Sequence, residues 1–277
     1  MIVDMNKHTL ICEEKEKVWV IGDVHGCYEQ FMQVINSSQI ARTDIVILIG
    51  DIIDRGPDSV KMLDWAIKNV NNGGKYLMIR GNHEQNIIED YVFLIEEWYR
   101  KDKQIIDKGE IPEDYRNQSI FNLRCEYDFC EYMERSGIVN VGQAEKYIDW
   151  MRKIPLYFRV KISNGKTFVI AHGWFEGTPV SDEEFYSLLS DDEIVWNRDI
   201  NSERNLIKDD YHPMEEGEIL VHGHTPIPAI GGHRARPAEP NFREHSINID
   251  GGCFMGERYG GRLIALCLNN YKVIYSN

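Results

Sequence analysis

The first ninety residues alternate between short apolar runs and segments with helical spacing, and this alternation constrains the fold more than any other feature. Apolar runs occupy residues 18–21, 45–49 and 76–79. Between them, residues 28–37 and 59–70 place apolar side chains three and four positions apart, as on one face of a helix. The order strand, helix, strand, helix, strand predicts a parallel sheet.

The chain after Pro155 reads differently, because short strand-like runs predominate. These runs lie at 156–162, 167–171, 219–221, 247–249, 263–268 and 272–275. The Gly165-Lys166 pair predicts a hairpin turn between the first two runs. Parallel strands followed by mainly antiparallel ones predict an α/β protein in which two sheets pack face to face, flanked by helices.

Residues from about 90 to 153 have mostly helical spacing with a polar, irregular middle, which predicts a helical insertion over the sheet. Candidate chemical residues are spread from position 23 to position 224, and only a single fold could bring them together. We therefore expect one domain over residues 1–277.

Polar clusters follow the apolar runs at the points where strands should end. The first three read GDVHG (22–26), GDIIDRG (50–56) and GNHE (81–84), and two later ones read AHG (171–173) and HGHTP (222–226). Ligands of open α/β sheets collect at the carboxyl ends of the strands. Carboxylate, imidazole and amide oxygen together suit a divalent ion such as Mn²⁺, Fe²⁺ or Zn²⁺. One cluster alone could be an ordinary turn, but five at successive strand ends predict a metal site.

In this order, GDVHG, GDIIDRG and GNHE resemble the signature of the phosphoprotein phosphatase branch of the metallophosphoesterases. The later AHG, VWNRD (195–199), GHTP and NIDG (248–251) resemble more narrowly the compact bacterial and phage lambda-type serine/threonine phosphatases. The resemblance spans about residues 17 to 268 and is weak in the helical stretch. It implies a sandwich of two mixed β-sheets flanked by helices (αββα layers), with a helical insertion.

The resemblance also implies a centre of two divalent metal ions, for which we expect Mn²⁺, with Fe or Zn as alternatives. The resemblance implies that Asp23 and His25 bind the first ion and that Asp51 bridges both ions. It implies that the second ion is bound by Asn82, His172 and His224. Two ions about 3.5–4 Å apart do need a bridging carboxylate. Their positive charge also explains how a chain of formal net charge −14 could hold an anion.

His222 and His224 lie two positions apart, so both could point to the same side of an extended strand end. The GHTP motif gives the metal-binding position to His224, and Gly223 and Pro226 would hold the turn that aims its imidazole. We expect a supporting or packing role for His222.

By resemblance, His83 is the general acid that protonates the leaving oxygen. Asp54 would be its hydrogen-bond partner and would favour the protonated imidazole. Arg55 and Arg198 are planar cations suited to phosphate oxygens, although Arg198 could instead form a surface salt bridge. We assign Asp250 to a turn or to the support of a ligand, without a catalytic role.

The expected activity is hydrolysis of phosphoserine and phosphothreonine in proteins by direct attack of metal-bound hydroxide. A phosphatase cysteine nucleophile is not expected, because no Cys-x5-Arg cradle with its glycines occurs. The alternative is hydrolysis of dinucleoside polyphosphates, for which Trp174, Phe175 and Phe254 could wall an adenine pocket. A catalytically silent binding module is disfavoured, because every implied ligand and the implied acid are present.

The net charge argues against a nucleic-acid-binding face, which needs clustered Lys and Arg. The six cysteines show no metal-site spacing, the N-terminus resembles no signal peptide, and no run reaches the roughly 20 apolar residues that span a bilayer. We therefore expect a cytoplasmic enzyme whose partner is a phosphorylated protein or a small phosphoester, with no nucleic acid and no membrane. Residues 231–245 are expected to form a surface loop, and the oligomeric state stays open.

Overall fold

The computed structural model describes residues 2–4, 8–71, 73–89, 141–174, 195–197, 217–230 and 237–277. Most of the predicted helical insertion therefore lies outside the described residues, as do Arg198, Phe175 and part of the 231–245 loop. No helix in the described ranges is long and apolar enough to cross a bilayer.

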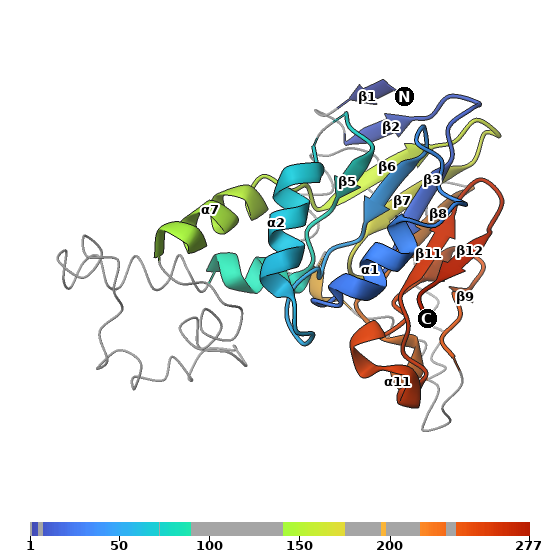
Figure 1. Cartoon of the computed structure of the whole chain (residues 1–277). Helices are drawn as coiled ribbons and strands as arrows, with labels where there is room; N and C mark the ends of the chain where they lie inside the picture. The colour runs from blue at the N-terminus through green and yellow to red at the C-terminus, as the bar shows by residue number, and fades with distance from the viewer. Residues whose placement is uncertain are drawn as a thin grey trace.

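Two β-sheets form the centre of the molecule (Figure 1). In spatial order, the five-stranded sheet contains β12 (Val273–Tyr275), β11 (Ile264–Cys267), β3 (Val18–Ile21), β4 (Ile45–Leu48) and β5 (Tyr76–Met78). The seven-stranded sheet contains β1 (Ile2–Asp4), β2 (Thr9–Ile11), β6 (Tyr157–Lys161), β7 (Thr167–Ala171), β8 (Glu218–His222), β10 (Ser246–Asn248) and β9 (Asn241–Phe242).

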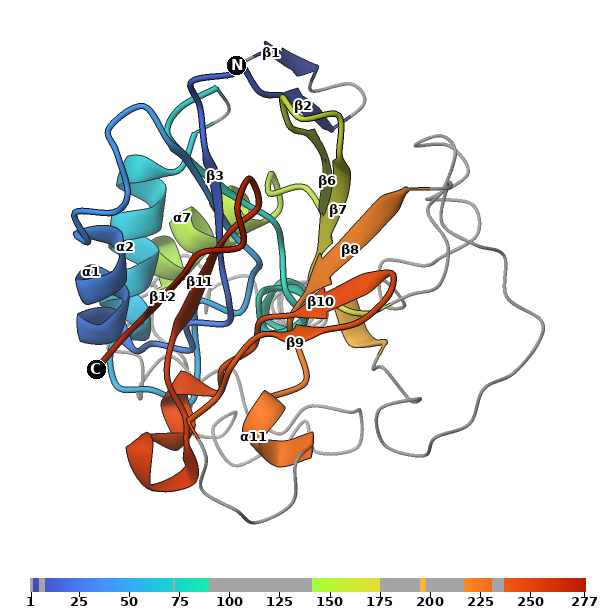
Figure 2. The ribbon, with the colours of Figure 1, turned by 90° about the vertical axis from the view of Figure 1, so that its right-hand side faces the viewer.

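Figure 2 shows the layers edge-on, with three helices on the outer face of the five-stranded sheet. These helices are α1 (Tyr28–Ile35), α2 (Ser59–Asn69) and α7 (Val141–Met151). On the outer face of the seven-stranded sheet, Val195 and the half-buried Trp174 pack against Val169 and Leu220. The expected sandwich of two mixed sheets with flanking helices is confirmed.

Burial on both faces explains why the central strands are continuous apolar runs. In β3, Trp19 packs toward the helices, whereas Val18 and Val20 pack toward the seven-stranded sheet. In β4, Leu48 and Ile47 divide in the same way between the two sides. A strand with both faces in a core has no position for a polar side chain, so its polar residues come only after its end.

The predicted parallel arrangement of β3, β4 and β5 is confirmed by their register, in which Val18 lies opposite Ile45 and Val46 opposite Tyr76. The predicted hairpin is also present, because β6 and β7 are antiparallel and Gly165 adopts a φ of 89° in the turn between them.

The expectation of mainly antiparallel strands in the second half is too simple. β8 runs parallel to both β7 and β10, whereas the β6–β7, β10–β9, β11–β12 and β11–β3 pairs are antiparallel. The chain between β7 and β8 is long enough to cross over and restart in the same direction. The strands β1, β2 and β9, which the spacing does not predict, have only two or three residues each.

Candidate metal centre

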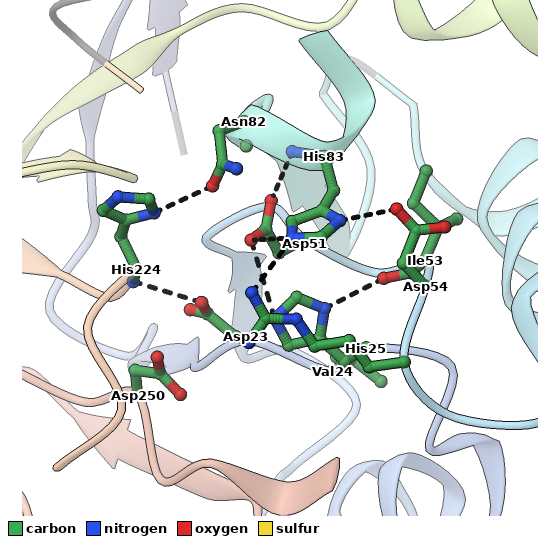
Figure 3. A network of polar contacts seen from close by, with 12 residues as sticks. Asp23, Val24, His25, Asp51, Ile53, Asp54, Asn82, His83, His224 and Asp250 are labelled. Carbon is green, nitrogen blue, oxygen red and sulfur yellow. Dashed lines mark hydrogen bonds and ion pairs between the residues drawn. The ribbon is translucent and has the colours of Figure 1, made fainter. Parts of the chain in front are cut away.

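The five polar clusters meet at the carboxyl ends of β3, β4, β5, β7 and β8. Figure 3 shows Asp23, Asp51, Asn82 and His224, which come from four of these clusters, lying around one centre. The side chains of the six predicted ligands are buried, with exposed fractions of 0–6%: Asp23, His25, Asp51, Asn82, His172 and His224. Residues separated by up to two hundred positions in sequence therefore share one polar interior.

Asp51 lies at the middle of this group. Its Oδ2 atom is 3.6 Å from His25 Nε2 and 3.3 Å from His172 Nε2. Two sets of possible ligand atoms share this residue, namely His25, Asp51 and His83 on one side and Asp51, His172 and His224 on the other. One carboxylate between two imidazole groups is the arrangement that a pair of bridged ions requires.

The backbone fixes which nitrogen of two histidines can bind a metal. His25 Nδ1 lies 2.9 Å from the carbonyl oxygen of Ile53, and His172 Nδ1 lies 2.8 Å from that of Ile49. A carbonyl only accepts hydrogen bonds, so each Nδ1 carries the proton and each Nε2 keeps its lone pair for the centre.

The amide oxygen of Asn82 lies beside the second set. This Oδ1 atom lies 2.9 Å from His172 Nε2 and 2.8 Å from His224 Nδ1. The backbone N–H of His224 donates to Asp23 Oδ2 at 3.1 Å, which ties the two sides of the centre together. Residues 82–89 are helical, so the helix begins at Asn82 and not after Glu84 as the spacing suggests.

Backbone strain is concentrated at the centre. Seven non-glycine residues of the described ranges have a positive φ, and five belong to the site: His25 (45°), Asp51 (49°), Asp54 (68°), Arg55 (63°) and His224 (66°). Each such conformation costs on the order of 1–3 kcal/mol and persists only where the surroundings enforce it. Strain gathered in one place in this way is typical of a functional site.

Two glycines make room for the carboxylates. A Cβ atom at Gly81 would lie 2.2 Å from Asp51 Oδ1, and one at Gly223 would lie 2.0 Å from Asp23 Oδ1. Either distance is impossible for real atoms, so any side chain at these two positions would displace a proposed ligand.

The electrostatics suit cations. Burial raises the pKa of Asp23 well above its usual range, and the neighbouring carboxylate of Asp250 raises it further. Burial opposes protonation of His172, but Asp51 and Asp23 outweigh it and raise the pKa of His172 to about 10. Asp23 Oδ1 has no hydrogen-bond partner within the described part of the chain. Divalent ions would relieve the repulsion among the carboxylates and displace the imidazole proton, so the donor set fits two such ions.

His83 lies beside this group and contacts Asp54. Its Nδ1 is 2.5 Å from Asp54 Oδ2, and its Nε2 is 3.3 Å from Nη2 of the exposed Arg55. Burial and the guanidinium lower the pKa of His83, but the carboxylates of Asp51 and Asp54 outweigh them and raise it. The arrangement can hold a proton close to the metal ligands, as a general acid requires.

The structure brings together all the predicted site residues that it describes, while Arg198 lies outside the described residues. The individual roles of these residues in metal binding and catalysis stay predictions. His222 ends β8 with an exposed fraction of 1%, and burial lowers its pKa to about 4. Within the described residues it belongs to neither set of possible ligand atoms.

Alanine variants of the two neighbouring histidines should separate their roles. We expect His224→Ala to lose one of two metal ions and most activity, because its imidazole contacts Asn82 in the second set. His222→Ala should keep both ions and serves as the matched control. Metal analysis of both proteins is the measurement, and loss of an ion from His222→Ala alone would reverse the assignment.

Sequence reasoning missed the role of Glu84. Its Oε2 accepts the backbone N–H groups of Asp51 at 2.8 Å and Gly81 at 2.9 Å, and its Oε1 accepts that of Ile52 at 2.9 Å. Burial and the charge of Asp51 raise the pKa of Glu84 to about 7. The sequence signal was the acidic residue of the GNHE motif itself, but two of its three backbone partners lie more than thirty residues away.

Glu84→Ala should therefore destabilise the protein markedly. Three buried N–H groups would lose their acceptor, and at roughly 1–3 kcal/mol for each unsatisfied group the free energy of unfolding should fall by about 3 kcal/mol or more. Urea denaturation of the metal-free protein measures this, with the exposed Glu29→Ala in α1 as control. Equal stability of the two variants would show that Glu84 does not hold the site.

Comparisons with known proteins agree with the geometry. The sequence model of the calcineurin-like phosphoesterase family matches residues 16–256. The chain is 25% identical over 256 residues to bis(5'-nucleosyl)-tetraphosphatase PrpE (asymmetrical) of Oceanobacillus iheyensis, covering 87% of this chain and 86% of the relative. It is 24% identical over 213 residues to serine/threonine-protein phosphatase 1 of Salmonella typhimurium, covering 76% and 79%.

A solved structure of a serine/threonine phosphatase from Saccharomyces cerevisiae, with similarity to human phosphatase PP5, has the same fold. It superposes with a TM-score of 0.56 at 13% identity, covering 98% of this chain and 83% of that one. These matches confirm the resemblance to phosphoprotein phosphatases seen in the motifs. With a family match over residues 16–256 and carboxylate, imidazole and amide groups gathered at the carboxyl ends of strands from both sheets, the chain belongs to the calcineurin-like phosphoesterases.

Proposed function

We propose that this metallophosphoesterase hydrolyses dinucleoside polyphosphates, cleaving diadenosine tetraphosphate asymmetrically with one water to AMP and ATP. The observation that carries the proposal is the near full-length match to proteins named asymmetrical bis(5'-nucleosyl)-tetraphosphatases, in Oceanobacillus iheyensis and in Anoxybacillus flavithermus. The match to a symmetrical enzyme, of Wigglesworthia glossinidia brevipalpis, covers only 56% of this chain and 43% of that protein.

Aromatic side chains beside the centre support a nucleotide substrate. The ring of Phe254 lies 5.0 Å from the ring of His25 and 4.5 Å from the guanidinium carbon of Arg55. The ring of Trp196, which is 40% exposed, lies 5.8 Å from that of His224. Stacking of a base on an aromatic ring contributes about 1–3 kcal/mol. Trp174, by contrast, packs into the hydrophobic cluster beneath the sheet.

Within the proposal, the six ligands would hold two divalent ions, with Mn²⁺ as the expected metal: Asp23, His25, Asp51, Asn82, His172 and His224. Such ions would supply polarisation of the phosphoryl oxygens and a water of lowered pKa. Arg55 stands exposed at the rim and holds oxygens of the polyphosphate chain. His83, held by Asp54, gives its proton to the leaving oxygen. We keep the expectation of a single domain, because the proposed ligands come from both sheets. We also keep the expectation of a cytoplasmic enzyme.

Hydrolysis of phosphoproteins is the second candidate, and it is the activity that sequence reasoning placed first. The match to serine/threonine-protein phosphatase 1 favours it, although over a smaller share of the chain than the match to the tetraphosphatase PrpE. The metal ligands do not distinguish the two activities, because both need a phosphoryl group between the same ions.

A direct comparison of substrates tests the proposal. The purified Mn²⁺-loaded protein is assayed on diadenosine tetraphosphate, on a panel of phosphopeptides and on an aryl phosphate, with Asp51→Asn protein as the control for contaminants. We expect kcat/KM for the dinucleotide to exceed that for the best phosphopeptide by about tenfold or more, equivalent to 1.4 kcal/mol of differential transition-state binding. Chromatography of the products should show equal amounts of AMP and ATP. A preference for phosphopeptides supports the second candidate, and ADP as the product overturns asymmetric cleavage.

A further inference from the structure

Asp250 is a buried carboxylate that the mechanism above does not use. It lies two residues after the end of β10 and has an exposed fraction of 0%. Its N–H donates to Asn248 Oδ1 at 2.8 Å, its carbonyl oxygen accepts from Ile227 N–H at 2.9 Å, and its Oδ1 accepts from Gly252 N–H at 2.9 Å. These three hydrogen bonds fix both the backbone and the side chain of Asp250.

None of these three hydrogen bonds involves the second carboxylate oxygen of Asp250. Oδ2 is buried and has no hydrogen-bond partner among the residues described, and the same is true of Oδ1 of Asp23. Figure 3 shows Asp250 beside Asp23 and the backbone of His224. Two neighbouring buried carboxylates, each with an unpaired oxygen, repel each other unless one of them takes up a proton, and a cation or its water ligands between them would remove the repulsion with both groups charged.

A turn-forming role alone does not require a carboxylate at this position. The hydrogen bond from Gly252 needs one side-chain oxygen, which the neutral amide of asparagine can also supply. The negative charge strengthens that one hydrogen bond, but it also adds repulsion toward Asp23 and Asp51. The charge and the free oxygen therefore point to the metal centre.

We propose that Asp250 is a positioning residue for the ion that Asp23 and His25 hold. Its Oδ2 accepts a hydrogen bond from a water ligand of that ion, and its charge strengthens the binding of the cation. Carboxylates that act on a metal through its ligands typically change metal affinity by about 10–100-fold. The inference rests on the proposed metal centre and is independent of which phosphoester the enzyme cleaves.

The test compares Asp250→Asn with Asp44→Asn as the control. Asparagine is used at both positions, because it keeps the size and one acceptor oxygen of aspartate. Asp44 is 3% exposed and lies at the opposite end of β4 from the centre, where its Oδ2 accepts from Trp19 Nε1 at 3.0 Å and from Ala41 N–H at 2.9 Å. Thermal unfolding of the metal-free proteins and calorimetric titration with Mn²⁺ alone give two readouts that need no substrate.

Asp250→Asn should unfold at the same temperature as the wild type or higher, since it loses repulsion, while its affinity for at least one Mn²⁺ falls about 10–100-fold. Asp44→Asn should unfold at a lower temperature, because two N–H groups lose a charged acceptor there, and it should bind Mn²⁺ as the wild type does. Unchanged Mn²⁺ affinity of Asp250→Asn overturns the proposal. A fall in unfolding temperature as large as that of Asp44→Asn also overturns it, because Asp250 would then be structural. If the wild type binds no Mn²⁺ pair, the metal centre itself is wrong.

Discussion

Replacing Asp51 with asparagine should empty both metal positions and reduce hydrolysis by about 10³-fold or more, since the ions supply several kcal/mol of transition-state stabilisation and each 1.36 kcal/mol is tenfold in rate. Within the described residues, Asp51 is the one residue shared by both sets of possible ligand atoms, and its Oδ2 lies 3.6 Å from His25 Nε2 and 3.3 Å from His172 Nε2. A neutral amide cannot bridge two dications in its place.

Asparagine is the right replacement because Asp51 has a φ of 49°, a conformation that asparagine tolerates better than alanine does. Its side-chain oxygen can also keep the hydrogen bond from His83 N–H, which is 2.9 Å long. Metal content and kcat/KM are measured on Asp51→Asn and on the remote Asp44→Asn. Two ions per chain in Asp51→Asn would show that it is not the bridge.

The second large effect should come from His83→Asn. Loss of a general acid slows reactions with poor leaving groups by about 10²–10⁴-fold. Hydrolysis of an activated aryl phosphate, whose leaving oxygen hardly needs a proton, should suffer much less. Metal content should stay at the wild-type level, because Asp54 and not a metal orients this imidazole through Nδ1.

The measurement of metal content separates two roles for His83, general acid and metal ligand. A ligand role is possible on geometry, because His83 Nε2 is 3.9 Å from Asp51 Oδ2 and belongs to one set of possible ligand atoms. If His83→Asn loses an ion, His83 is a ligand. If the metal stays but both classes of substrate slow equally, the acid role is wrong. Asp54→Asn should behave as a milder version of the same change, since it removes the charge that raises the pKa of His83.

The sequence predicts the core of this fold well because the strands that carry the site are buried on both faces. Residues 18–21 and 45–49 contain no polar side chain, so the polar ligands could stand only after those strands. The strand ends of one parallel sheet share an edge, and their motifs therefore locate the centre without coordinates.

Other features depend on contacts that side-chain spacing does not encode. The role of Glu84 lies in three backbone N–H groups, two of which are more than thirty positions away. The unpaired oxygen of Asp250 becomes evident only once residues 249–250 are placed beside Gly22 and Asp23. The direction of β8 is set by a long connection and not by its own residues, so its parallel pairing could not be predicted from its composition.

Titration of the chelator-treated protein with Mn²⁺, with bound metal and hydrolysis of diadenosine tetraphosphate followed together, tests the central claim most directly. The six proposed ligands and the shared carboxylate of Asp51 predict two ions per chain, with activity appearing as the pair fills. A single bound ion at full activity, or full activity in the protein that retains none, would contradict the dinuclear centre.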